Sequence, residues 1–294
     1  MTVISWLSAV PTRLREQANL RIRAAAGLTQ DPPDPCLDPR EAYLPVDGVA
    51  RLVHGDISSM MIGGLASLFF EMLHPHTMAG VAQHSRYQDD PLGRVLQTAN
   101  FIGFTTYGSK SRAADSIERV RAIHQGVRGV ADDGVAYNAG DPHLLGWIHC
   151  AGTDMFLTAF QRYARATLTS DEADRYVEEM AIVARDLGGE TPPTNVAELK
   201  AVLEGFRPEL RLSADAVTAR DFVARGVLEG AVQKLLYRLL VRSAFDLQPP
   251  WAQTMLGVRR RPLLNQFIIR PATRVVARAL RVAVPPTTRV NGRG

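Results

Sequence analysis

The chain has 294 residues, of which 46% are apolar and 22% are charged, and its formal net charge is +4. This composition is typical of a globular protein, long enough for one large domain or two modest ones, and it excludes a largely disordered chain. The positive excess is small, comes almost entirely from arginine and lies mainly towards the two ends. We therefore expect no nucleic-acid partner.

The cysteines and the start of the chain favour a cytoplasmic protein. Cys36 and Cys150 form no disulfide framework and no Cys-x-x-Cys or Cys-x-x-Cys-His motif, which argues against cysteine-based zinc and covalently attached haem. The apolar run in residues 1–11 is short and has no basic region before it, unlike a secretory signal. The longest apolar run, 57–73, contains Ser58, Ser59 and Glu71, so we expect a buried helix there rather than a membrane span.

The N-terminal part predicts an arm followed by buried helices. Residues 1–28 fit a basic amphipathic helix, and the Pro-rich stretch 31–35 ends it, so that 1–40 form an arm and a stiff linker. The apolar helix 57–73 ends at His74-Pro75-His76, and a second helical segment covers 81–87.

Two acid-proline pairs predict the starts of further helices. An acidic N-cap followed by proline in the first turn favours helix initiation, and Asp90-Pro91 and Asp141-Pro142 both have this order. Another helix is expected over 111–127, with a Gly/Asp-rich loop between it and Asp141.

The remaining elements are also helical. Thr169 with Glu172, and Asn195 with Glu198, have the spacing of capping boxes, and 221–245 is rich enough in apolar residues for one or two helices. Alternating β-branched runs joined by tight turns are nearly absent. The sequence therefore predicts an all-α fold, with an arm over 1–40, one helical domain over 41–250 and a basic tail over 251–294.

The tail carries arginines at helical spacing. Arg270, Arg274, Arg278 and Arg281 fall on one face, and apolar residues lie between them. A helix of this kind can lie on an anionic membrane surface, or it can pack on its parent domain with a solvated basic face. Both alternatives stay open at this point.

Two histidines carry most of the chemical information. His124 follows Ile117 and Val120 on one helical stripe, with Arg121 one turn before it. His149 lies two turns into the helix that starts at Asp141, with Gly152 and Thr153 one turn further on. Each histidine is either a core residue bonded to the backbone or a ligand of a metal or cofactor.

A haem-binding helical protein needs an axial histidine, cationic or hydroxyl groups for the propionates and an apolar slot. His149 and His124 match the ligand role, Arg121 matches the cationic role, and Gly152 and Thr153 line the slot. Zinc is the competing metal, but the sequence contains no His-Glu-x-x-His motif and no carboxylate cluster close to a histidine. His74-Pro75-His76 is interpreted as a helix end without a metal role.

Several segments between Gly55 and Phe245 together resemble the rubber oxygenase (latex-clearing protein) and MpaB-type oxygenase family. They are Gly55-Asp56, Leu73-His74-Pro75, His84-Ser-Arg86, Asp90-Pro-Leu-Gly93-Arg94, Arg119-Val-Arg121-Ala-Ile-His124, Tyr137-Asn-Ala-Gly-Asp141-Pro142 and Trp147-Ile-His149.

The resemblance implies an all-α fold with globin-like helix packing around non-covalent haem b. It implies that His149 is the proximal iron ligand and that Arg121 lies near the haem. His124 falls where the rubber oxygenase has a distal lysine, so this chain departs from the family there. The stretch Phe104-Thr-Thr-Tyr107-Gly also lacks the glutamate that the rubber oxygenase uses as a base, and Tyr107 and Asp154 are the nearest candidates in the sequence.

Three functions follow as hypotheses. The first is a haem-dependent oxygenase that uses dioxygen or peroxide on a small or lipid-like hydrophobic substrate, with His149 anchoring iron and His124 acting in the distal pocket. The second is a haem sensor or electron-transfer protein in which His124 and His149 both bind iron. The third is a cofactor-free helical protein that contacts membranes through its basic tail.

Overall fold

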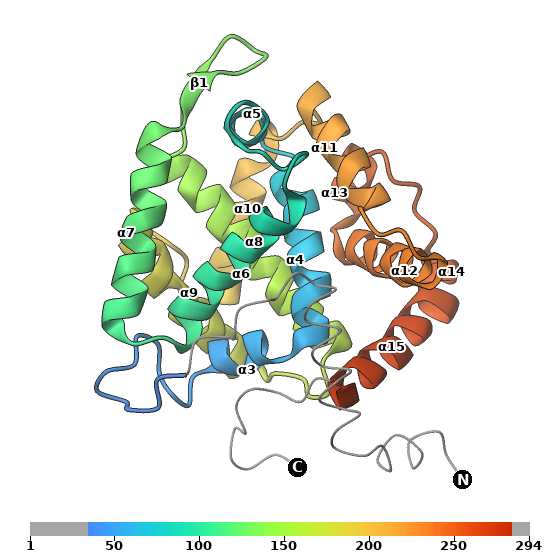
Figure 1. Cartoon of the computed structure of the whole chain (residues 1–294), viewed down its shortest axis with the longest axis horizontal. Coiled ribbons are helices and arrows are strands. Elements are labelled where there is room, and N and C mark those ends of the chain that lie inside the picture. The colour runs from blue at the N-terminus through green and yellow to red at the C-terminus, as the bar shows by residue number, and fades with distance from the viewer. Residues whose placement is uncertain (1–34, 284–294) are drawn as a thin grey trace.

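The computed structural model describes residues 35–283. At its centre, helix α4 (Ile57–Glu71) packs along helix α8 (Pro142–Tyr163) (Figure 1). The two helices approach closely because α4 has a glycine at the contact: a Cβ atom on Gly63 would lie 2.9 Å from Cδ1 of Phe156. These two helices carry Glu71 and His149, two side chains of the candidate functional site.

The other helices surround this pair. Helix α12 (Ala231–Leu247) packs on α4, and α9 (Ser170–Leu187) and α10 (Val196–Phe206) pack on α8. Helices α6 (Pro91–Tyr107) and α7 (Lys110–Gly126) pack on each other. The remaining elements are α3 (Val49–Gly55), α5 (Pro75–His84), η1 (Arg207–Glu209), α11 (Ala214–Arg225), α13 (Pro250–Met255), α14 (Pro262–Leu264), the π-helical turn η2 (Asn265–Ile269) and α15 (Arg270–Ala283).

Large side chains fill the core between these helices. The aromatic ones that are almost fully buried are Phe69, Phe70, Trp147, Phe160, Tyr163 and Tyr176. Burying one large apolar side chain contributes roughly 1.5–3 kcal/mol, so these residues account for much of the packing energy between α4, α8 and α9.

The all-α prediction is confirmed, and so are the helix starts. The Asp90 and Asp141 side chains accept hydrogen bonds from backbone N–H groups in the first turns of α6 and α8. Thr169 and Glu172 form both bonds of a capping box at the start of α9. At α10, Asn195 is the N-cap as expected, but Glu198 binds Thr194 instead of closing the box on Asn195.

The loop expected before Asp141 contains a small antiparallel hairpin. Strands β1 (Arg128–Val130) and β2 (Ala136–Asn138) pair through it. Gly134 has a φ of 79°, a conformation that favours glycine, and it follows Asp133 in an Asp-Gly hairpin signal. The hairpin was not predicted, and each of its strands is only three residues long.

The described part of the C-terminal segment packs on the domain. Ala252 and Leu256, which follow α12, are fully buried in the hydrophobic core. The Ser58 hydroxyl donates to the carbonyl of Ala277 at 3.1 Å, and the Arg281 guanidinium binds Asp56 at 2.5 Å. Of the two alternatives for the tail, the structure therefore shows packing on the parent domain, while residues 1–34 of the expected arm and 284–294 lie outside the described residues.

Hydropathy gives a limited result for membrane insertion. Within residues 35–283, no individual helix has the length and apolar composition to cross a bilayer, and only α3 and α4 taken together, bent by 90° at their junction, meet both criteria.

Asp246 is the buried anion that ties α15 to the core. Its carboxylate accepts from Arg270 at 2.7 Å, from Arg162 at 3.3 Å and from Asn265 at 2.7 Å. We expect Asp246→Ala to lower the free energy of unfolding by about 2–4 kcal/mol, because it leaves two partly buried guanidinium groups without their counter-ion. Urea denaturation measures this loss. Asp89→Ala, which breaks an exposed ion pair with Arg86, is the control and should have little effect; equal losses in both variants would contradict the role given to Asp246.

Candidate functional site

His149 has an unpaired ring nitrogen in the protein interior. Its Nε2 atom is buried and has no hydrogen-bond partner among the described residues. Burial lowers the pKa of His149 to about 4, so the imidazole is neutral at pH 7 and one ring nitrogen carries a free lone pair. An unsatisfied buried polar group costs about 1–3 kcal/mol and calls for an explanation. A metal bound to this lone pair would supply one.

The neighbouring face of α8 carries a second unpaired group. Gly152, one turn beyond His149, lies close to α4, since a Cβ atom there would be 3.5 Å from the Ser67 hydroxyl. Thr153 is buried, and its Oγ1 also has no hydrogen-bond partner within the described part of the chain. The three predicted residues of this face, His149, Gly152 and Thr153, are thus brought together on one side of α8.

A carboxylate lies opposite this face. Glu71, at the end of α4, has its Oε1 only 3.9 Å from the Cβ position of Gly152, and the Ser67 hydroxyl donates to it. Burial raises the pKa of Glu71, while the Ser67 hydrogen bond and the charge of Arg94 act in the opposite direction. The sequence did not indicate that Glu71 faces this side of α8, because Glu71 and Gly152 are far apart along the chain and are brought together only by helix packing.

Arg94 is the cation of this region. It lies on α6, and its positive charge lowers the pKa of His124 as well as that of Glu71, so it stands within electrostatic reach of both side chains. His124 is half-buried in the last turn of α7, and burial is the larger cause of its lowered pKa. His124 and Glu71 therefore both feel the charge of Arg94.

Arg121 has a different environment. It is exposed and lines a surface pocket between α7 and α9, together with Arg185 and Asp186. Its predicted contact with a cofactor stays a prediction.

The two bases suggested by sequence proximity have structural partners. The Tyr107 hydroxyl donates to the carbonyl of Arg51 at 3.1 Å, and Asp154 binds the Lys200 ammonium at 2.6 Å beside a surface pocket. Glu71 is the better candidate, because it is partly buried and its carboxylate lies against Gly152, one turn from His149 on α8.

His54 shows what a structural core histidine looks like in this fold. Its Nδ1 binds Thr106 Oγ1 at 2.7 Å and its Nε2 binds the Tyr176 hydroxyl at 3.0 Å. Burial lowers its pKa to about 4, as for His149, but both of its nitrogens are satisfied. The structural interpretation that applies to His54 therefore leaves the unpaired nitrogen of His149 unexplained.

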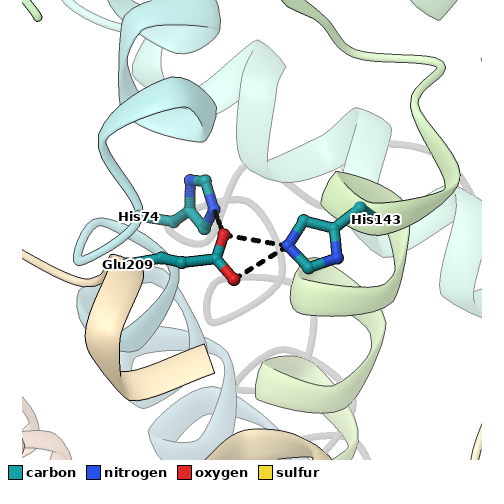
Figure 2. Close-up of side chains that lie close together, drawn as sticks. All are labelled: His74, His143 and Glu209. Atoms are coloured by element: carbon teal, nitrogen blue, oxygen red, sulfur yellow. Dashed lines mark hydrogen bonds and ion pairs between the residues drawn. The ribbon is translucent and has the colours of Figure 1, made fainter. Parts of the chain in front are cut away.

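A second cluster lies at the N-terminal end of α8. His74, His143 and Glu209 each offer a ligand atom, and these atoms lie within 4.8 Å of one another (Figure 2). His74 was expected to have no metal role, because His74-Pro75-His76 was interpreted as a helix end; Glu209 is 135 positions away and is brought to His74 by the fold.

Comparison with known proteins assigns the family. The family model described as "ER-bound oxygenase mpaB/B'/Rubber oxygenase, catalytic domain" matches residues 51–282. The chain belongs to this family. The match confirms the expected resemblance and extends it through α15, and the name of the family indicates an oxygenase. Searches of curated proteins and of solved structures found no match.

Glu71 should make stability depend on pH. Its pKa in the folded state is raised above the ordinary value of 4.5, so Glu71 ionises more easily in the unfolded chain than in the folded one. The free energy of unfolding therefore falls as the pH rises from about 4.5 towards the folded-state pKa. Glu71→Gln removes this loss and keeps a group that can bind Ser67. We expect its melting temperature to match that of the native chain near pH 4 and to exceed it by roughly 2–4 °C at pH 7.5.

The control is Glu178→Gln, on the exposed side of α9, which should show no such divergence. Thermal melts between pH 4 and pH 8 decide the matter. A Glu71→Gln variant that is less stable than the native chain at pH 7.5 would mean that Arg94 holds Glu71 as a needed anion.

Proposed function

We propose that this protein is a haem-dependent oxygenase that acts on a small or lipid-like hydrophobic substrate, with His149 as the proximal ligand of a b-type haem. The observation that carries the proposal is the buried, unpaired Nε2 of His149 in a member of an oxygenase family. Iron is a natural partner for a neutral imidazole at this position, and helical haem proteins commonly use such a ligand.

The surrounding residues fit this group. Gly152 has no side chain beside His149, and the Thr153 hydroxyl is free to bind a polar group. Cys150, the neighbour of His149, is a poor alternative ligand, because burial, helped by the charge of Asp154, raises the pKa of its thiol to about 12 and keeps it protonated. The absence of a Cys-x-x-Cys-His motif agrees with non-covalent binding.

Haem iron, when bound, would supply the activation of dioxygen or peroxide. The chain itself supplies the proton chemistry. Glu71 is positioned to accept a proton from the substrate or return one at its carboxylate, because its raised pKa brings it closer to neutral pH than an exposed glutamate. Ser67 orients this carboxylate by its hydrogen bond, and Arg94 limits how far the pKa rises.

His124 serves as the distal residue in this proposal. Its lowered pKa keeps the imidazole neutral at pH 7, so it can donate or accept one hydrogen bond without adding a charge. A hydrophobic substrate is favoured by the partly buried apolar side chains of the helices around the site, among them Leu65, Phe101, Ile148 and Phe156.

An absorption spectrum tests the cofactor. We expect the full-length protein, produced with haem supplied, to show a Soret band. The His149→Ala variant should bind haem at least about tenfold more weakly. His84→Ala is the matched control, since His84 is exposed and its ring binds only the carbonyl of Arg128 among the described residues. A colourless native protein would overturn the proposal. A low-spin ferrous form that does not bind dioxygen, and that is lost in His124→Ala, would favour the sensor or electron-transfer hypothesis.

Turnover tests the carboxylate. With an unsaturated fatty-acid ester as the probe and a reductant present, we expect Glu71→Gln to bind haem normally and to consume dioxygen about 10²-fold more slowly, because the loss of a general acid or base costs about that much. The native pH profile should lose its carboxylate limb in the variant. Unchanged turnover in Glu71→Gln would remove Glu71 from the mechanism without affecting the assignment of His149.

A further inference from the structure

The second cluster combines residues from three separate elements. His74 lies between α4 and α5, His143 lies in the first turn of α8, and Glu209 ends η1 (Figure 2). Nε2 of His143 is 2.8 Å from Oε2 and 3.0 Å from Oε1 of Glu209, and Nε2 of His74 is 3.5 Å from Oε2. The three side chains therefore converge on one point.

His74 is incompletely satisfied at this point. It is only 1% exposed, and neither of its ring nitrogens has a hydrogen-bond partner within residues 35–283. Glu209 is shared between the two histidines: it binds His143 closely, whereas its Oε2 approaches Nε2 of His74 only to ion-pair distance, 3.5 Å, and leaves that buried ring without a hydrogen bond among the described residues. A ligand that accepts a lone pair from His74 would satisfy it.

The fold holds these groups in place independently of any ligand. The backbone N–H of Arg211 donates to the carbonyl of Leu73 at 2.8 Å, which fixes the end of η1 against the end of α4. The Asp141 cap fixes the start of α8, and the ring of His143 packs on Phe206 with a centroid distance of 4.6 Å. Preorganisation of this kind reduces the cost of binding.

Two imidazoles and one carboxylate form a donor set suited to zinc. This His₂Glu set leaves a fourth position open, whereas Mg²⁺ and Ca²⁺ prefer oxygen ligands alone. Donors about 2.0–2.1 Å from a tetrahedral zinc ion lie about 3.3 Å from one another. The nitrogen–oxygen separations of 2.8–3.5 Å are close to this spacing, and all three ligand atoms lie within 4.8 Å of one another.

We propose that His74, His143 and Glu209 form a binding site for one divalent transition-metal ion, best suited to Zn²⁺, that clamps the end of α4 to the start of α8. The site is accessible, since the side chains of His143 and Glu209 are 55% and 42% exposed. It shares no ligand with the site at His149 and does not depend on the proposed oxygenase function.

The clamp would reach the other site through a short path. His74 follows Glu71 by three positions, and the Trp147 indole N–H donates to the carbonyl of Glu71 at 3.2 Å. The ring of Trp147 also lies beside that of His74, with centroids 6.2 Å apart. Metal binding would therefore restrain the last turn of α4, which carries Glu71.

Calorimetric titration of Zn²⁺ into the full-length protein, made without a histidine tag and freed of metal with a chelator, tests the proposal. We expect one ion per chain in the native protein, at least tenfold weaker binding in His143→Ala and in Glu209→Gln, and a zinc-dependent rise in melting temperature that both variants lose. Co²⁺ should give the visible absorption bands of a tetrahedral site. His143 and Glu209 are partly exposed, so the variants retain the core.

His76→Ala and Glu204→Gln are the controls. The ring of His76 lies 5.4 Å from that of His74 but pairs with Asp133, and Glu204 pairs with Arg207. Both controls, and also His149→Ala, should keep full zinc binding. The proposal is overturned if zinc binding is absent or exceeds one ion without saturation, if His143→Ala and Glu209→Gln bind as the native chain does, or if His76→Ala weakens binding equally.

Discussion

The close antiparallel contact between α4 and α8 is the constraint on which the rest of the structure depends. Gly63 faces Phe156 at one end, Gly152 faces Ser67 and Glu71 in the middle, and His74 meets His143 at the other end. Because glycine replaces a side chain at two of these points, the helices lie close enough for short polar groups on one to reach the other. Both clusters are products of this one packing arrangement.

Unsatisfied polar groups mark these clusters more clearly than residue type does. His54 and His74 are buried and His149 is partly buried, and burial lowers the pKa of each, but among the described residues only His54 has hydrogen-bond partners for both ring nitrogens. Leaving the others unpaired costs about 1–3 kcal/mol apiece, a large fraction of the stability of a domain. Departures from local stability of this kind are expected where a protein binds a ligand, and here they coincide with a family match to an oxygenase.

The sequence predicted what local patterns determine and missed what distant contacts determine. Caps and helical periodicity are local, so the starts of α6, α8 and α9 and the shared face of His149 and Thr153 followed from the sequence. Glu71 and Glu209 were missed because helix periodicity states which way a side chain faces, but not which helix lies opposite. The cation whose charge lowers the pKa of both Glu71 and His124 is Arg94 on α6, a residue that the motif around Arg121 could not indicate, since its position depends on how α6 packs.

Trp147 makes the two clusters mechanically dependent on each other. Its indole N–H donates to the carbonyl of Glu71, while its ring packs against His74 and against Phe206, the residue directly before the η1 turn that ends at Glu209. A shift of the last turn of α4 therefore changes the position of the Glu71 carboxylate and the geometry of the His74 ligand atoms together. Because buried cores deform little, we expect binding at one cluster to restrict the movement of side chains at the other through the contacts of Trp147.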